Sequence, residues 1–216
     1  MEDRVLTDGI VWLSRPRAAD IDTITALCQE PSIGEWVTIP VPYRRTAAEG
    51  FLTDIADAGW ANRSPVWAIR EDENKPVLGM IGLEDRGTSA AEIGFWLGSR
   101  YRGMGLMSRA VRLVCDFGLA GEGMGLVRIS WHAFVGNYAS AAVVRRNGFH
   151  YEGMTRLGSV QRGVRRDSWM AARLATDPAE PAADWPAHTF AESAPEASRT
   201  AERCETTRAV DLVSDE

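Results

Sequence analysis

The chain has 216 residues, of which 45% are hydrophobic and 25% are charged, as is usual for a globular protein. Its net charge of −6 is unevenly distributed: residues 177–216 hold ten acids and three arginines, and the preceding part holds 20 acids and 21 bases. A nearly neutral folded part lacks the strong positive field with which proteins bind nucleic acids, so we expect no nucleic-acid partner.

The cysteines and the apolar segments limit the class further. Cys28, Cys115 and Cys204 are odd in number and widely spaced, so they predict neither a disulfide framework nor a metal site. The longest stretch without a charge, 129–144, has 16 residues and is too short to span a bilayer, so we expect no membrane partner. The acidic start Met-Glu-Asp-Arg is unlike a signal peptide, and a single lysine beside 23 arginines is typical of a GC-rich bacterial genome. We expect a cytoplasmic bacterial protein.

The first half of the chain reads as a strand, two helices and three strands. Apolar residues 9–14 predict a strand, and Ile21, Ile24 and Leu27 share one face of a helix that follows Pro16. After a proline-interrupted segment, residues 46–58 predict a helix with Phe51 and Ile55 directed inward. Three further strands, separated by turn sequences and close enough for an antiparallel meander, are expected at 66–70, 77–84 and 91–97.

The second half alternates helices and strands. A loop with glycines and arginines, 99–105, precedes a helical pattern, and the expected elements are a helix at 106–119, a strand at 127–135, a helix at 138–146 and strands at 149–154 and 168–174. This order predicts a mixed α/β sheet. Residues 178–216 are rich in Pro, Ala, Glu and Ser, so we divide the chain into a folded domain, 1–176, and a disordered acidic tail, 177–216, in which Trp185 and Phe190 are the only aromatic residues.

The loop Arg102-Gly103-Met104-Gly105 is a candidate anion site. The first N–H groups of a helix lack internal partners and carry positive potential, and glycines let a diphosphate approach the backbone. A phosphate-binding Walker loop needs a lysine followed by Ser or Thr, whereas Lys75 precedes a proline. A dinucleotide fingerprint would turn directly after its strand, whereas five residues separate residue 97 from Gly103. A surface turn without a ligand remains the alternative.

Three segments in order resemble the GNAT acetyltransferases, more narrowly the RimJ/RimL-type branch of ribosomal-protein N-terminal acetyltransferases. They are Ala-Glu-Ile-Gly-Phe-Trp-Leu at 91–97, Arg-Gly-Met-Gly-Leu-Met at 102–107, and Asn-Tyr-Ala-Ser at 137–140 followed by Arg-Asn-Gly-Phe-His-Tyr-Glu-Gly at 146–153. The resemblance covers about residues 8–175. It implies the α/β (α+β) GNAT fold: a mixed, mostly antiparallel sheet of about seven strands, flanked by helices, in which two central parallel strands, 91–97 and 127–135, splay apart.

The resemblance also implies acetyl-CoA as co-substrate. In the family, the pattern Arg/Gln-x-x-Gly-x-Gly/Ala wraps the pyrophosphate of coenzyme A, and it maps onto Arg102, Gly105 and Met107; because Met107 is larger than the usual residue, we expect its side chain in the packed face of the helix. The pantetheine would pair with the splayed strand, and an amide of residues 95–97 would polarise the thioester carbonyl. The implied cofactor-binding residues are Phe95, Trp96, Leu97, Arg102, Gly103, Met104, Gly105, Leu106, Met107, Asn137 and Ser140.

Aminolysis of a thioester needs a neutral amine, donors for the oxyanion, and a donor for the departing thiolate. Many relatives place a tyrosine after the asparagine, but the serine of this branch maps onto Ser140, which we expect to assist the thiolate; capping and packing are the alternative roles of Asn137 and Ser140. A glutamate that related enzymes can carry on the later hairpin is replaced by Ser159. Glu92 is therefore the first candidate base and His132 the second, with a water relay as a third option.

By the same resemblance, residues 20–60 and the hairpin 156–167 form the acceptor groove. We expect Glu35, Trp36, Tyr43 and Arg156 to contact the acceptor, through attraction of a cationic amine, stacking, and pairing with a carboxylate or phosphate, unless they are only solvated surface groups. The expected acceptor is the α-amino group of a protein or peptide N-terminus. A small-molecule amine, such as an antibiotic, an aminoacyl-nucleotide toxin or a polyamine, is the alternative, followed by a non-catalytic acetyl-CoA-binding module. A homodimer is left open.

Overall fold

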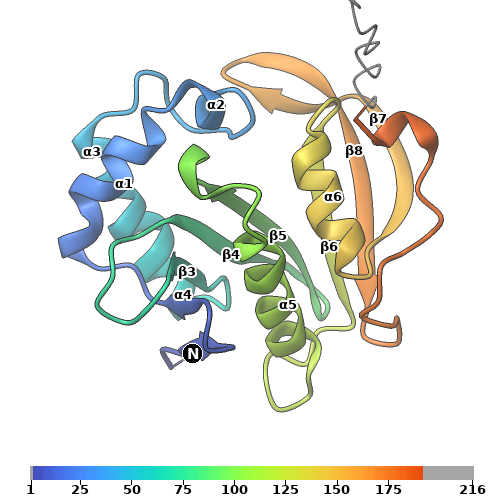
Figure 1. Cartoon of the computed structure of the whole chain (residues 1–216), viewed down its shortest axis with the longest axis horizontal. Coiled ribbons are helices and arrows are strands. Elements are labelled where there is room, and N and C mark those ends of the chain that lie inside the picture. The colour runs from blue at the N-terminus through green and yellow to red at the C-terminus, as the bar shows by residue number, and fades with distance from the viewer. Residues whose placement is uncertain (1, 192–216) are drawn as a thin grey trace, which may run out of the picture.

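The computed structural model describes residues 2–191, and at its centre these residues form one sheet in the order β1-β2-β3-β4-β5-β6-β8-β7 (Figure 1). Only β5 and β6 run parallel; every other neighbouring pair is antiparallel, so the mixed, mostly antiparallel sheet is confirmed. The strands are β1 (Leu6–Thr7), β2 (Trp12–Ser14), β3 (Val66–Arg70), β4 (Gly79–Gly87), β5 (Ala90–Leu97), β6 (Arg128–Phe134), β7 (His150–Gln161) and β8 (Val164–Leu174).

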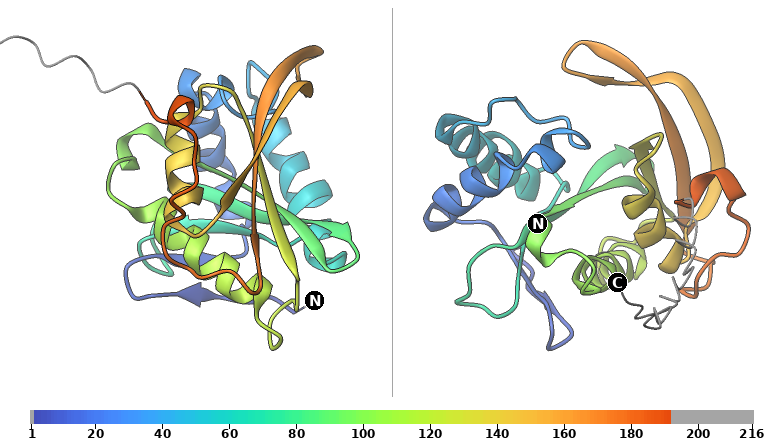
Figure 2. Two further views of the ribbon diagram at one scale, coloured as in Figure 1. Left: turned by 90° about the vertical axis from the view of Figure 1, so that its right-hand side faces the viewer. Right: turned by 45° about the horizontal axis from the view of Figure 1, so that its top comes forward.

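Helices cover both faces of this sheet, with α5 and α6 on one face and α1 and α3 on the other (Figure 2). Alternate strand residues face the two layers: Ile81 and Leu83 pack with α5, whereas Met80 packs with α1 and α3. The helices are α1 (Ile21–Cys28), α2 (Pro31–Gly34), α3 (Arg45–Gly50), α4 (Ala58–Ala61), α5 (Leu106–Leu119) and α6 (Tyr138–Arg146), with 3₁₀ turns η1 (Ala18–Asp20), η3 (Ser99–Tyr101) and η4 (Ala187–Thr189). None of the described helices is long and apolar enough to cross a membrane.

The helix expected at 46–58 is interrupted by a π-helical segment, η2 (Phe51–Asp57), between α3 and α4. A π-helix holds more residues per turn than an α-helix, so the inward positions recur at wider spacing. The buried side chains accordingly follow every fourth residue: Ala48, Leu52, Ala56 and Trp60. The prediction that Ile55 points inward was therefore wrong, and its side chain is 56% exposed.

The predicted boundary of the folded domain at residue 176 was also wrong, because residues 177–191 pack across α6 and β7 (orange-red in Figure 1). The Trp185 indole N–H donates to the Phe149 carbonyl at 2.7 Å, and the Ala182 N–H donates to the Arg145 carbonyl at 3.0 Å. Trp185 is only 6% exposed and belongs to the main core cluster. One buried tryptophan anchors a segment whose composition alone resembles a solvated tail. Residues 192–216 of the expected tail lie outside the described residues.

Candidate active site

The two parallel strands separate after three residue pairs. β5 and β6 are paired at Ala90 with Arg128, Ala91 with Ile129, and Glu92 with Ser130, and the pairing ends there although both strands continue. Each diverging strand is held by its outer neighbour, β5 by β4 and β6 by β8. The predicted splay is thus confirmed, and it leaves the inner edges of both strands free to pair with an extended ligand.

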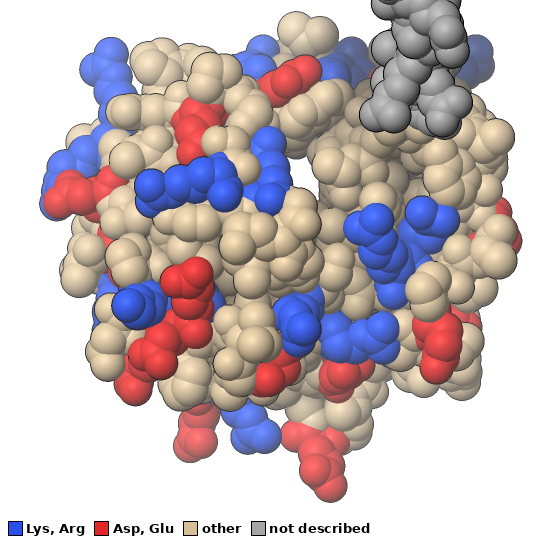
Figure 3. Space-filling view, in the orientation of Figure 1, with Lys and Arg blue, Asp and Glu red and all other residues tan. Residues whose placement is uncertain are grey.

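Side chains do not fill this gap completely. The space-filling view shows a cleft between the segment that follows β5 and α6, with cationic side chains beside it (Figure 3).

The glycine loop predicted to bind an anion lies open at the start of α5. Gly103 and Gly105 have φ values of +76° and +78°, in the left-handed region that favours glycine, and a Cβ added at either would meet nothing within 4 Å. Gly105 caps α5 with no side-chain hydrogen bond, so the first N–H groups of this helix face an exposed turn. Met104 is 61% exposed, and Met107 is buried in the packed face of α5, as expected.

The other cofactor candidates at the end of β5 pack into the protein. Phe95 lies against the α5 layer, Trp96 against the α1 and α3 layer, and Leu97 is buried. The Arg102 Nε donates to the Leu97 carbonyl at 2.9 Å, which ties the loop to the strand end. What residues 95–97 offer to a ligand in the gap is consequently their backbone.

Asn137 and Ser140 lie together at the N-terminus of α6, as the spacing predicted. The Asn137 side-chain oxygen accepts the Ser140 N–H at 3.2 Å, so Asn137 is the N-cap of the helix. The Ser140 hydroxyl oxygen accepts a hydrogen bond from the Trp131 indole N–H at 3.0 Å. Sequence reasoning missed Trp131. One feature of the sequence could have pointed to it: Trp131 lies on the apolar face of a predicted strand. A tryptophan buried there needs a hydrogen-bond acceptor for its indole N–H.

Glu92 and His132 lie on the opposite face of the sheet, where they form a pair across the fork. A Glu92 carboxylate oxygen is 3.2 Å from His132 Nδ1 and 2.8 Å from an Arg86 guanidinium nitrogen. Burial alone would raise the pKa of Glu92, but the hydrogen bonds from His132 and Arg86 outweigh it, and the pKa lies below its usual value. An ionised carboxylate only accepts hydrogen bonds, so Nδ1 of His132 carries a proton, and in the neutral imidazole Nε2 is then the acceptor.

A cavity of about 540 Å³ opens beside Glu92, between the sheet and the segment of η2 and α4. Its charged lining residues are Asp54, Glu84 and Glu92, with no Lys or Arg. Arg86 pairs with two of these carboxylates, Glu84 and Glu92, and offsets part of their negative charge, so that the lining keeps a net acidic character.

The two parts of the predicted acceptor groove are joined by Gln161 at the tip of the β7–β8 hairpin. Its side-chain amide donates to three carbonyls at and just after α2, those of Gly34, Glu35 and Val37. The Arg166 guanidinium lies over the Trp36 ring with its carbon 5.6 Å from the ring centre. The α2 segment therefore forms one wall with the hairpin.

Three of the four predicted acceptor residues remain accessible there. Glu35 and Arg156 are exposed and Trp36 is half-buried. The prediction for Tyr43 was wrong: its side chain is only 5% exposed, it packs in the cluster around α1 and α3, and its hydroxyl lies beside Cys28. We therefore remove it from the groove.

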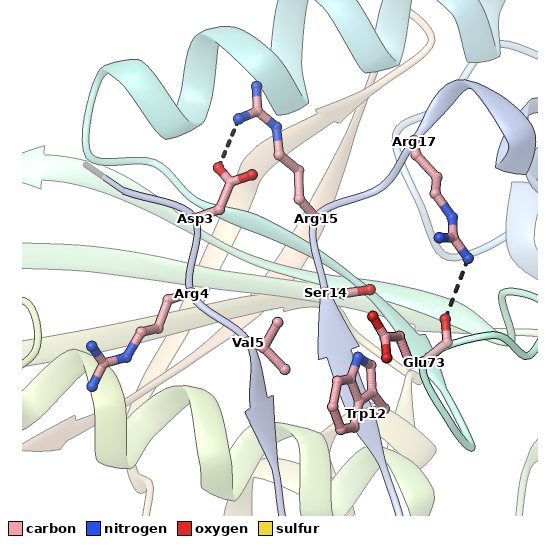
Figure 4. Close-up of a pocket in the computed structure, with 8 residues that line it drawn as sticks. All are labelled: Asp3, Arg4, Val5, Trp12, Ser14, Arg15, Arg17 and Glu73. Atoms are coloured by element: carbon pink, nitrogen blue, oxygen red, sulfur yellow. Dashed lines mark hydrogen bonds and ion pairs between the residues drawn. The ribbon is translucent and has the colours of Figure 1, made fainter.

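Two other features lie outside the site. Cys115 is fully buried, and burial raises the pKa of its thiol to about 12, so it does not supply a thiolate nucleophile. A second cavity, of about 210 Å³, lies at the β1–β2 edge of the sheet (Figure 4). Its Arg15 is already paired with Asp3 and Asp57, and Arg17 donates to the Glu73 carbonyl. No group of three or more metal-ligating side chains occurs in residues 2–191.

Comparison with known proteins places the chain in a family. Residues 11–150 match the model of the acetyltransferase (GNAT) domain. The chain is 37% identical to the ribosomal N-acetyltransferase named YdaF of Bacillus subtilis over 93 residues, which are 42% of this chain and only half of that protein. It is 27% identical over 167 residues to a Bacillus licheniformis protein named N-acetyltransferase p20, covering 73% of this chain and 90% of the other.

Solved structures share the fold at low identity. The ribosomal-protein-S5-alanine acetyltransferase of Vibrio fischeri has a TM-score of 0.70 at 19% identity, covering 83% of this chain and all of that one. RimJ of Mycobacterium smegmatis, in complex with CoA-disulfide, has a TM-score of 0.69 at 20% identity, covering 80% of this chain and 86% of that one. MccE, a Microcin C7 self-immunity acetyltransferase in complex with acetyl-CoA and AMP, has a TM-score of 0.68 at 19% identity, covering 78% of this chain and 93% of that one. These structures confirm the expected fold, and because the family model matches well over half of the chain, the protein belongs to the GNAT acetyltransferases.

Proposed function

We propose that the protein transfers the acetyl group of acetyl-CoA to a primary amine, the α-amino group of a protein or peptide N-terminus, by direct attack in a ternary complex. One observation carries the proposal. The two strands part at Glu92 and Ser130, with the Glu92–His132 pair on one face of the sheet and Ser140 on the other. A thioester in the gap would thus have a proton acceptor on the side of an incoming amine and a hydroxyl on the side of the departing sulfur.

The residues present suit coenzyme A. The exposed amides of 103–105 and of the first turn of α5 would hold the diphosphate, and the glycines leave room for it. The free edge of β5 would pair with the amides of the pantetheine, and a backbone N–H of residues 95–97 would polarise the thioester carbonyl. The complexes of RimJ with CoA-disulfide and of MccE with acetyl-CoA support this assignment.

In the proposed reaction the amine is neutral when it attacks; ionised Glu92 holds the Nδ1–H of His132, and Nε2 of the imidazole takes a proton from the amine nitrogen as the N–C bond forms. The nitrogen attacks the carbonyl carbon, and the C=O electron pair moves to the oxygen. When the carbonyl re-forms, the C–S bond breaks and its electron pair leaves with sulfur, which receives a hydrogen bond from the Ser140 hydroxyl. The nitrogen loses one proton to His132, which passes it to solvent, and the thiolate takes up one proton from solvent, so the protons balance.

The groove between α2 and the hairpin supports a peptide acceptor, because exposed Glu35 precedes half-buried Trp36, whose ring carries the Arg166 guanidinium, so that the wall presents both charges and a ring surface. A small cationic amine is the second candidate acceptor. The observation that favours it is the cavity beside Glu92, whose charged lining is entirely acidic.

The test is the release of thiol from acetyl-CoA with a panel of N-terminal peptides, polyamines and aminoglycosides, followed by mass spectrometry of the product. Glu92→Gln and His132→Gln should each lower kcat about a hundredfold or more. Asp3→Asn is the control: Asp3 also pairs with an arginine, Arg15, but at the β1–β2 edge of the sheet, outside the site. The absence of thiol release with every amine, or full activity of both Glu92→Gln and His132→Gln, would overturn the proposal.

A further inference from the structure

The Ser140 hydroxyl is held by a single hydrogen bond, in which it is the acceptor. The donor is the indole N–H of Trp131, at 3.0 Å from the hydroxyl oxygen. An indole N–H only donates, and a hydroxyl has one proton of its own to give. Among residues 2–191 the structure provides no acceptor for that proton, not even the Gly136 carbonyl one turn back along the chain. Trp131 thus fixes the oxygen and leaves the proton of Ser140 free for a ligand.

Trp131 lies on β6 at the position where the strand separates from β5. It is the first residue after Ser130, the last one paired with β5, and it is 2% exposed on the face that carries α5 and α6. Its ring therefore lies beneath α6 at the point where the gap opens. A hydroxyl that accepts a hydrogen bond also becomes a better donor, because hydrogen bonds in series polarise one another.

The ring of Trp131 is in turn fixed by the C-terminal segment. The Trp185 ring lies 5.9 Å away at an angle of 56°, and Tyr151 packs on the far side of Trp185 at 5.5 Å. Trp185 is locked by its hydrogen bond to the Phe149 carbonyl and is nearly fully buried. This segment lies beyond the residues that match the family model, 11–150.

We propose that Trp131 is a positioning residue, which aims the Ser140 hydroxyl at the departing sulfur, and that Trp185 holds Trp131 in place for this purpose. The inference rests on the proposed function and assigns no chemistry to either tryptophan: the Ser140 hydroxyl alone donates the hydrogen bond to sulfur. No bond other than those of the proposed reaction forms or breaks. The C-terminal segment, expected to be a tail, becomes a support of the active site.

The test compares kcat and the acetyl-CoA KM of Trp131→Phe, Ser140→Ala and the double variant. Phenylalanine keeps most of the ring but lacks the N–H, so we expect kcat to fall about tenfold, as for the loss of one hydrogen bond, with the KM for acetyl-CoA unchanged. The double variant should be no slower than Ser140→Ala, because the indole acts only through the hydroxyl. Trp185→Phe should lower kcat in the wild-type background and have no effect in the Trp131→Phe background.

Trp67→Phe is the matched control. Trp67 is fully buried and its indole donates to the Arg4 carbonyl at 2.7 Å, so the variant loses a comparable bond far from Ser140. It should lose stability and keep kcat, and the melting temperature of every variant separates unfolding from positioning. Wild-type kcat in Trp131→Phe, or a double variant whose loss is the product of the single losses, overturns positioning alone. A wild-type protein that binds acetyl-CoA but acetylates no amine overturns the proposed function, and positioning with it.

Discussion

Replacing Gln161 by leucine should loosen the acceptor groove without affecting the cofactor site. The side chain is 5% exposed, its amide donates to three carbonyls of the α2 segment, and its oxygen accepts from Arg166 at 2.7 Å. Two amide N–H groups at about 1 kcal/mol each and one charged hydrogen bond at about 1.5 kcal/mol give a loss of about 3.5 kcal/mol. The Val37 carbonyl loses its side-chain partner altogether, whereas Arg162 and Arg166 still donate to those of Gly34 and Glu35.

For a chain of this length, that loss lowers the melting temperature by about 7–14 °C. Because Glu35 and Trp36 lie on the released segment, we expect the KM for the acceptor to rise about tenfold or more, while the affinity for acetyl-CoA stays at the wild-type value. The assay combines thermal unfolding, calorimetric titration with acetyl-CoA and steady-state kinetics. Gln29→Leu, which removes a single hydrogen bond to the Tyr43 carbonyl at an exposed position, is the control. An unchanged acceptor KM in Gln161→Leu would refute the reasoning.

Three further predictions concern other parts of the protein. Gly105→Ala should weaken acetyl-CoA binding about tenfold or more in calorimetry, because the added Cβ would stand where the diphosphate approaches. Gly125→Ala is the control: it carries a similar backbone strain of about 1–2 kcal/mol and should bind acetyl-CoA normally. Asp20→Ala should lower the free energy of unfolding in denaturant by about 3–5 kcal/mol, because it removes the carboxylate partner of the buried Arg70 guanidinium. A decrease below about 1 kcal/mol would contradict the burial argument. The hydrogen bond from Arg128 holds the pKa of Glu152 in the folded protein below its usual 4.5. The ionised carboxylate therefore stabilises the fold above pH 4.5, and this contribution should be lost as the pH falls through the pKa of the folded state. Unfolding midpoints measured across this range should show a smaller decline in Glu152→Gln, and an identical decline would contradict the assignment.

The sequence allowed the strands, the glycine turn and α5 to be predicted because each rests on local patterns. Alternating apolar residues mark β4 and β5, and two glycines before an apolar helix mark a turn with free amides. The fork between β5 and β6 was not derivable from periodicity, since a splayed strand has the same pattern as a paired one. It came from the resemblance to the family.

The errors have long-range causes. The register of the helix around Ile55 depends on a π-helical segment, which no spacing rule for α-helices includes. Tyr43 was placed in the groove by chain position, whereas the packing of α1 and α3 buries it. Trp185 lies in a segment of polar composition, and only its contacts with Phe149 and Trp131 show that the segment is part of the fold.

The candidate catalytic groups were predicted singly, and the structure combines them. Glu92 and His132 were alternatives in the sequence, separated by 40 positions, and the parallel register of β5 and β6 brings them within hydrogen-bonding distance. Ser140 was predicted from a motif, but its hydrogen bond to Trp131 depends on how α6 packs on β6. Pairings of this kind follow from tertiary contacts, which a single sequence does not display.

The most direct measurement is a crystal structure of the protein with acetyl-CoA. The account predicts the diphosphate on the amides of 103–105, the pantetheine along the free edge of β5, and the thioester between the Glu92–His132 pair and Ser140. A cofactor bound outside the fork, or a fork in which β5 and β6 pair along their whole length, would contradict it.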